Sequence, residues 1–405
     1  TAIGFKALLD NTTASNNTAV GFQALKDNST GETNVAIGKD ALGSNTTANQ
    51  NIAIGVSALA LNTTGARNIA IGHSAIDACD TETDNIAIGF EAMTTNNAGG
   101  IENIAIGSYS MDTLTSGDKN IGIGHSTLSN ITSGLRNNCI GHTAGLNITS
   151  GHDNVAFGYY ALRTQTTGAY NVAMGYYALN ALTTASNNTV IGGEAGVAVT
   201  EGATNTLIGM FAGREINTGD NNTCLGSNAG RSTSPGGSIT TADNTVTIGN
   251  NAIDTANVQV DWTIPSDKRD KTDVKPVKMG LDFVNKLEPV TYHWDKRARY
   301  VDEDDIDSGE ISLSNVVHDG THKEDWTDIG FLAQDVEKLE EEYGHKLEDK
   351  SNLTFRHSED DHYGLTYTKF VPILTKAIQE LSAKNDSLET SNQALIARIE
   401  ALENA

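Results

Sequence analysis

The sequence is poor in aromatic residues, cysteine and positive charge, and it has no apolar run as long as a membrane span. Aromatic residues make up 6% and all hydrophobic residues 38% of 405 residues, which is thin for an ordinary globular core. Lysine and arginine number 27 against 51 acidic residues, giving a formal net charge of -24. This balance argues against nucleic-acid binding and against insertion into or binding to anionic membranes. With 40 glycines, the composition favours an elongated architecture built from small residues.

The three cysteines, Cys79, Cys139 and Cys224, lie far apart. Cys139 and Cys224 stand where a repeat carries aliphatic residues, so we interpret them as small buried hydrophobes rather than disulfide partners or metal ligands. The sequence starts inside that repeat and without a signal peptide, which predicts a fragment of something longer.

A repeat fills residues 1 to about 250, with the unit Asn-Ile-Ala-Ile-Gly-x-x-Ala-Leu. Asn stands four residues before the glycine in thirteen units. The step between glycines is 17 residues, once 18, and 23 at the end: they fall at 4, 21, 38, 55, 72, 89, 107, 124, 141, 158, 175, 192, 209, 226 and 249.

Each unit predicts one turn of a β-solenoid. Ile52 and Ile54 lie two apart with Ala53 between them, the period of a strand, and we expect the isoleucine pair to face the core. The opposite face would carry small residues such as Ala53 and receive a docking neighbour. Gly55 allows a bend, and residues 62–67 have turn chemistry. Fourteen turns at a strand spacing of ~4.8 Å make a rod roughly 65–70 Å long.

The Asn-x-Ala-Ile-Gly unit resembles the left-handed β-roll of trimeric autotransporter adhesin heads, and it is similar to shafts of phage tail fibres. The adhesin unit is usually somewhat shorter than 17 residues. The resemblance implies that the narrow coil associates with neighbouring chains.

Rings recur at matching places in the repeat. His125 and His142 would stack on adjacent turns, but no carboxylate or cysteine recurs beside them, so we predict no metal site and no cofactor. Tyr159-Tyr160 and Tyr176-Tyr177 match in adjacent units, and we interpret them as a packing ladder rather than a sugar-stacking surface.

The stretch Ser266-Asp267-Lys268-Arg269-Asp270-Lys271 separates the repeats from an irregular, charged region. Ser266 is a candidate nucleophile and Lys271 a candidate base, and a Ser–Lys pair can cleave an acyl bond if the lysine is neutral. The nearest bond is Pro265–Ser266, so the local hypothesis is self-cleavage. Such pairs are common in charged linkers, so the spacing alone is a weak signal.

The region around and beyond this stretch predicts short mixed elements: a strand at 258–264, a helix at 280–287, a strand at 290–294, an acidic loop at 301–325, a strand end leading into a helix at 329–337, and a final helix after 365–367.

This set resembles the intramolecular chaperone domain of endosialidases, phage tail spikes and tail fibres, a self-cleaving serine peptidase family. The resemblance rests on the Ser266 stretch, the Leu287-x-Pro289-Val290-x-Tyr292-x-Trp294 stretch, residues 330–336, and Tyr367 before the last helix. It implies that Ser266 is the nucleophile, Lys271 the base, and the cut lies just before Ser266. Asp267, Arg269 and Gln334 match motif positions, but we assign them no catalytic role. We interpret Asp267 and Arg269 as a structural salt bridge.

The C-terminal segment predicts a coiled coil, with an a/d seam over almost four heptads. Asn385 and Asn392 occupy heptad positions a, where asparagine often indicates a dimer. The adhesin heads and the chaperone domains that this chain resembles are trimers, so we expect three chains. The seam consists of Ile378, Leu381, Asn385, Leu388, Asn392, Leu395, Ile399 and Leu402.

The predicted protein is therefore an elongated homotrimer. It has an all-β solenoid of 17-residue repeats (1–250), a strand and linker (251–265), a small α+β chaperone domain (266–369) and a trimeric coiled coil (370–405). We expect a tail fibre or tailspike on the virion, assembled in the host cytoplasm, whose chaperone drives trimerisation and then cuts itself off. Expected partners are a host cell-surface glycan or protein receptor and other virion tail proteins.

Two alternatives stay open at this stage. One is a bacterial trimeric surface adhesin with a borrowed chaperone. The other is a polysaccharide-depolymerising tailspike, which hydrolysis of polysaccharide by the purified trimer would reveal.

Overall fold

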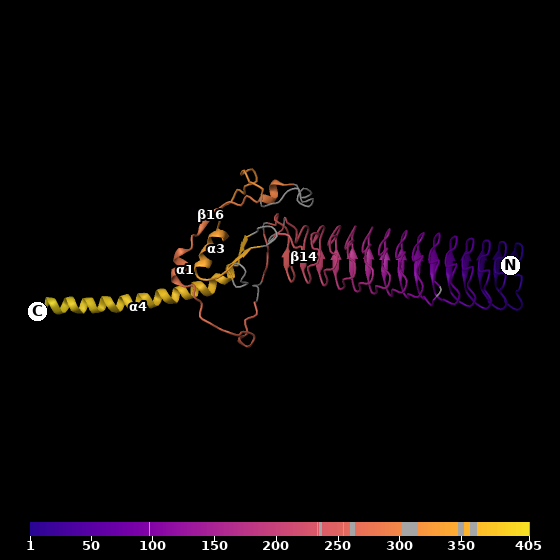
Figure 1. Cartoon of the computed structure of the whole chain (residues 1–405), viewed down its shortest axis with the longest axis horizontal. Coiled ribbons are helices and arrows are strands. Elements are labelled where there is room, and N and C mark those ends of the chain that lie inside the picture. Colours follow the sequence, from indigo (N-terminus) through magenta and orange to yellow (C-terminus); the bar gives the residue numbers. More distant parts are fainter. Residues whose placement is uncertain are drawn as a thin grey trace. The chain divides into compact units, whose positions relative to one another are not determined.

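The computed structural model describes residues 1–96, 98–232, 234, 237–253, 255–259, 264–301, 315–346, 352–356 and 363–404. They fall into two compact units, Thr1–Ala252 and Ile253–Ala405 (Figure 1). Within the described residues, no helix has both the length and the apolar character needed to cross a membrane.

The first unit is the predicted β-solenoid. Its strands pair in parallel and in chain order, and Figure 1 shows them stacked coil upon coil. The register follows the repeat, so that Ala53 pairs with Ala70 and Ala156 with Ala173. The strands β1 to β15 in the described residues are Ala2–Ile3, Thr18–Val20, Val35–Ile37, Ile52–Ile54, Ile69–Ile71, Ile86–Ile88, Ile104–Ile106, Ile121–Ile123, Asn138–Ile140, Val155–Phe157, Val172–Met174, Thr189–Ile191, Thr206–Ile208, Thr223–Leu225 and Val246–Ile248.

The expected orientation of the strands is wrong. Ala53 is fully buried in the coil, whereas its neighbours Ile52 and Ile54 are only half-buried on the outer face. The narrow interior of the coil already contains Ala58 and Leu59 of the same turn, so the central strand residue can add only a small methyl group beside them. The isoleucines therefore form apolar columns along the outside of the sheet. The small residues do not form a docking surface.

The periodic glycines are required by close backbone approach between turns. Gly55 has φ +141°, and a Cβ on it would collide with the carbonyl group of Gly72 in the next turn. The same contact recurs from Gly4 to Gly209 along the stack. A side chain at these positions would be excluded both by conformation and by space.

The periodic asparagines form a buried hydrogen-bonded ladder. Asn120 is fully buried; its Nδ2 donates to the carbonyl of Gly134 at 2.8 Å. Its Oδ1 accepts the backbone N–H of Asn137, one turn on, at 3.0 Å. Each asparagine thus satisfies backbone groups that would otherwise be buried without partners.

Replacing Asn120 by Ala is expected to lower the free energy of unfolding of the solenoid by about 2–4 kcal/mol, because it orphans buried groups on two turns. Chemical denaturation followed by circular dichroism measures this. The control is Asn130→Ala, whose exposed side chain bonds Asn147 and which should cost less than about 0.5 kcal/mol. Equal losses in the two variants would show that the buried ladder is not what holds the turns.

The second unit is a small α+β arrangement followed by a long helix. Its α-helices are α1 (Leu281–Lys286), α3 (Ala333–Glu342) and α4 (Phe370–Glu403). Strands β16 (Val290–Tyr292) and β17 (Asp328–Gly330) pair antiparallel, as do β18 (Thr354–Arg356) and β19 (Tyr363–Leu365). Short 3-10 helices are η1 (Lys268–Asp270), η2 (Arg297–Tyr300) and η4 (Tyr367–Lys369). These elements confirm the helix predicted at 280–287, the strand predicted at 290–294, which ends at Tyr292, the passage from strand to helix at 329–337, and the final helix.

Two expectations fall partly on residues outside the description. For the strand predicted at 258–264, residues 260–263 are not described, and Val258, Gln259 and Ile264 are not in strand conformation. For the acidic loop predicted at 301–325, residues 302–314 lie outside the described residues.

A compact core joins α1, α3 and the start of α4. Phe331 stacks on Phe370 with ring centroids 5.4 Å apart. The fully buried carboxylate of Glu340 accepts the backbone N–H groups of Leu353 at 2.6 Å and Thr354 at 2.9 Å. The buried apolar residues are Met279, Phe283, Val336, Leu339, Leu353, Phe370 and Ile373.

Helix α4 changes character along its length. Phe370, Ile373 and Ala377 are buried in the core, whereas the heptad residues beyond them are exposed. The exposed fractions run from 53% at Leu381 to 71% at Leu402. The helix also holds α1, because the Glu380 carboxylate accepts the N–H of Leu281 at 2.7 Å.

The contact between Glu380 and α1 predicts a pH-dependent stability. The bond from the Leu281 N–H, and secondly one from Lys376, lower the pKa of Glu380 below its ordinary value of 4.5. Since the folded pKa is the lower one, the contact stabilises the fold above about pH 4.5 and its contribution disappears as pH falls through the folded value.

The stability difference between the parent and Glu380→Gln should therefore be present at pH 7 and shrink as the pH falls below about 4.5, as measured by thermal unfolding. Glu389→Gln, an exposed carboxylate on the same helix, is the control. A difference that stays constant with pH would contradict the proposed linkage.

Candidate functional site

A one-turn 3-10 helix brings Ser266 and Lys271 together. Asp267 caps η1 by accepting the N–H of Arg269 at 2.9 Å, and the Lys271 N–H closes the turn on the carbonyl of Lys268. The chain folds back over five residues, so Lys271 returns beside Ser266. This local turn is the physical reason why a Ser and a Lys at this spacing can meet.

The Lys271 Nζ donates to the Ser266 Oγ at 2.5 Å. This is within the reach that a general base needs for the proton of a nucleophile. The Pro265 carbonyl carbon belongs to the residue directly before Ser266, so the hydroxyl, the amine and the Pro265–Ser266 peptide bond all lie within one short segment. Pro265, Ser266 and Lys271 are all exposed.

Asp267 and Arg269 form an ion pair two residues apart. The Arg269 Nη2 lies 2.5 Å from Asp267 Oδ2, and Arg269 Nε donates to the same carboxylate. The bond from Arg269 holds the pKa of Asp267 below its usual range. The pair therefore braces the turn that carries the serine and the lysine. The third motif residue, Gln334, is exposed in the first turn of α3, and no hydrogen bond among the described residues joins it to Ser266 or Lys271.

Other motif residues pack around Gly330 at the end of β17. The Tyr367 hydroxyl accepts the N–H of Phe331 at 3.3 Å, and a Cβ on Gly330 would press on the hydroxyls of Tyr367 and Tyr292. Trp294 packs edge-on to Tyr292 and donates from Nε1 to Asp328 at 3.1 Å. These residues have a structural role in the domain.

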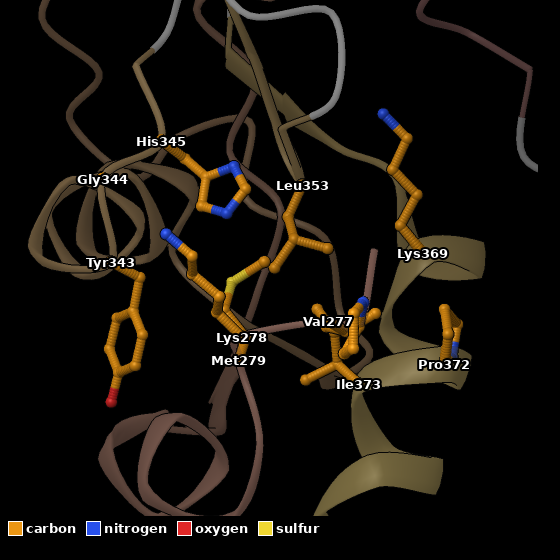
Figure 2. A pocket seen from close by; sticks show the side chains of 11 residues that line it. Val277, Lys278, Met279, Tyr343, Gly344, His345, Leu353, Lys369, Pro372 and Ile373 are labelled. Carbon is orange, nitrogen blue, oxygen red and sulfur yellow. The ribbon is translucent and has the colours of Figure 1, made fainter. Parts of the chain in front are cut away.

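A pocket of about 400 Å³ lies between the end of α3 and the start of α4. In Figure 2, Met279, Leu353 and Ile373 project toward its middle, whereas Tyr343 points away. Its lining includes Lys278, Lys369 and His345 but no acidic residue, and it does not include Ser266 or Lys271. No spacing in the sequence predicts it, because its lining comes from four separate parts of the chain: residues 276–279, 343–345, Leu353 and residues 369–373.

The solenoid carries the stacked rings that the repeat predicts. His125 stacks on His142 at 5.2 Å, and the described residues contain no group of three metal-ligating side chains suited to an ion. Tyr159 stacks on Tyr176 at 5.6 Å, which confirms the packing ladder. The three cysteines are buried and free, and burial raises the pKa of the Cys139 thiol to about 12.

Comparison with known families assigns the segment that holds the Ser–Lys pair. Residues 266–345 match the peptidase family described as chaperone of endosialidase. The match starts at Ser266 and includes Lys271. No curated protein and no solved structure matches the chain.

Proposed function

We propose that the C-terminal domain assembles three chains of a tail fibre and then cuts itself off between Pro265 and Ser266. Residues 266–345 match the chaperone-of-endosialidase family and follow a β-solenoid in the chain. This match supports a role as a trimerisation chaperone of the tail-spike and tail-fibre type, and the family implies a self-cleaving serine peptidase. The observation that carries the cleavage proposal is the 2.5 Å contact between Lys271 Nζ and Ser266 Oγ.

The chemistry is an acyl transfer within one chain. A neutral Lys271 takes the hydroxyl proton as Ser266 Oγ attacks the Pro265 carbonyl carbon; a C–O bond forms and the C–N bond breaks. The proton passes to the departing α-amino group of Ser266. Water then hydrolyses the ester, leaving a carboxylate on Pro265 and restoring the Ser266 hydroxyl.

Assembly would provide what the single chain lacks for this reaction. A lysine is a base only when neutral, and burial favours the neutral amine. Ser266 and Lys271 are exposed in the single chain. We propose that neighbouring chains cover them in the trimer, so that cleavage follows assembly and makes it irreversible.

Two exposed apolar surfaces support the proposal that chains associate. The heptad residues of α4 are exposed along one helix that extends beyond the core of its own unit. The isoleucine columns of the solenoid also lie outside, with Ile37 at 39% and Ile248 at 57% exposure. Since contiguous exposed apolar patches often mark interaction sites, these columns are the proposed contact between solenoids.

The cleaved product would be a solenoid rod ending at Pro265. We propose that it is part of a phage tail, assembled in the host cytoplasm, and that it binds a receptor on the host surface. Other tail proteins would hold it on the virion.

Sedimentation equilibrium of Ser266→Ala, which should stay uncleaved, tests the assembly part. The expected result is a homotrimer at micromolar concentration. A monomer with a fully folded solenoid would overturn the chaperone role, because it would show that the array forms without assembly.

A further inference from the structure

The solenoid carries exposed rings at the position directly after several repeat glycines, and on four consecutive turns they form a column. His125, His142, Tyr159 and Tyr176 follow one another on consecutive turns with centroids 5.2–5.6 Å apart and interplanar angles of 9–20°. Each inner ring has both faces covered by its neighbours. Sugar stacking on these inner rings is therefore blocked.

The column stops at Gly193. The backbone register places residue 193 between Tyr176 and Met210, since the Glu194 N–H bonds the Tyr176 carbonyl at 2.7 Å and the Phe211 N–H bonds the Gly193 carbonyl at 3.0 Å. A Cβ on Gly193 would meet nothing within 4 Å, and Gly193 is not among the positive-φ glycines. Neither space nor conformation requires glycine here, unlike at the repeat glycines.

The column therefore lacks one ring, at the turn of Gly193, and we call this place the Gly193 gap. Two turns at ~4.8 Å place Tyr176 and Met210 roughly 9.6 Å apart, which is room for one flat ring at the spacing that the rest of the column shows. Tyr176 and Met210 are each 54% exposed. Tyr176 stacks on Tyr159 and packs against the tilted ring of Tyr177, with centroids 4.5 Å apart, and among the described residues no ring beyond Gly193 stacks on it. Met210 follows on the next turn.

Polar residues come next to the gap in the chain. Tyr177 and Glu194 follow Tyr176 and Gly193 in the chain, and Glu194 pairs with Arg214 at 3.1 Å. A phenol, a carboxylate and a guanidinium beside an aromatic face suit a ring with an apolar face and hydroxyl groups at its edge.

We propose that the Gly193 gap binds one pyranose ring of a host-surface carbohydrate, stacked on Tyr176. The inference rests on the proposed role in host attachment and names the class of receptor and the residues that recognise it.

The test is binding of the assembled full-length chain to an array of immobilised oligosaccharides containing neutral hexoses, N-acetylhexosamines and acidic sugars. We expect binding to at least one sugar. Tyr176→Ala should weaken it about tenfold or more, and Gly193→Phe, which supplies the missing rung, should abolish it without lowering the melting temperature. The matched control is Phe90→Ala, whose ring is flanked by His73 and Tyr109 and whose loss should leave the affinity within about twofold.

Three results would overturn the inference: no binding to any sugar, unchanged binding by Gly193→Phe, or a changed oligomeric state in Gly193→Phe, which would show that another copy covers the gap. Sedimentation and intact mass of the same samples separate this from the proposed function. If trimers form and cleave while no sugar binds, only the Gly193 site fails; if neither assembly nor cleavage occurs, the chaperone proposal fails.

Discussion

The variants Ser266→Ala and Lys271→Ala should remain full-length chains under conditions in which the parent separates into two pieces. Removing the hydroxyl removes the nucleophile, and removing the amine removes the group 2.5 Å from it that can take its proton. Loss of either member of such a catalytic pair costs at least about 1,000-fold in rate. Intact mass followed over time measures the loss directly.

The same turn offers matched controls for both substitutions. Lys268→Ala removes a lysine from η1 and Thr272→Ala removes a hydroxyl one residue beyond Lys271, yet both should cleave at nearly the parental rate. Cleavage that persists in Ser266→Ala would show that another group attacks the Pro265 carbonyl. Cleavage that persists only in Lys271→Ala would show that the base is not Lys271.

The double substitution Leu381→Asp and Leu388→Asp should convert the proposed trimer into monomers and suppress the proposed cleavage. These side chains are 53% and 54% exposed on α4 and lie far along the helix from its buried start. Charges at two d positions would face one another across a three-chain seam and cost several kcal/mol per trimer. Sedimentation equilibrium and intact mass measure the two losses together.

The control places the same charges elsewhere on the helix. Ala383→Asp with Thr390→Asp falls on f positions of the same heptads, outside the seam, and should remain trimeric and cleave. If the d-position variant still forms trimers, α4 is not the element that assembles the chain. If it is monomeric but still cleaves, the reaction does not depend on assembly.

The sequence allowed the solenoid to be predicted because its signal is repeated. A 17-residue period sets the strand register, and the glycine and asparagine columns turned out to be required by backbone contact and buried hydrogen bonds. The orientation of the strands could not be read from Ile52-Ala53-Ile54, because period two is the same whichever face is inside. The width of the coil decides it, and only the packing of Ala53 beside Leu59 reveals that width.

The candidate site was predictable only in part. The residues Ser266 and Lys271 could be chosen by chemistry and family resemblance. Their contact depends on the turn capped by Asp267, and the charged sequence of this stretch does not predict that turn. The bond between Glu380 and the Leu281 N–H joins residues 99 apart and leaves no local signal. The Gly193 gap could not be predicted, because it is the absence of a ring from a column. The sequence does not show that the rings of neighbouring turns stack face to face.

Intact mass of the parent chain, taken separately on its monomeric and trimeric fractions, tests the coupling of assembly to cleavage most directly. The account predicts two pieces parting at Pro265–Ser266 in the trimeric fraction and an uncut chain in the monomeric one. Trimers that remain whole, or monomers that cleave as fast as trimers, would contradict it.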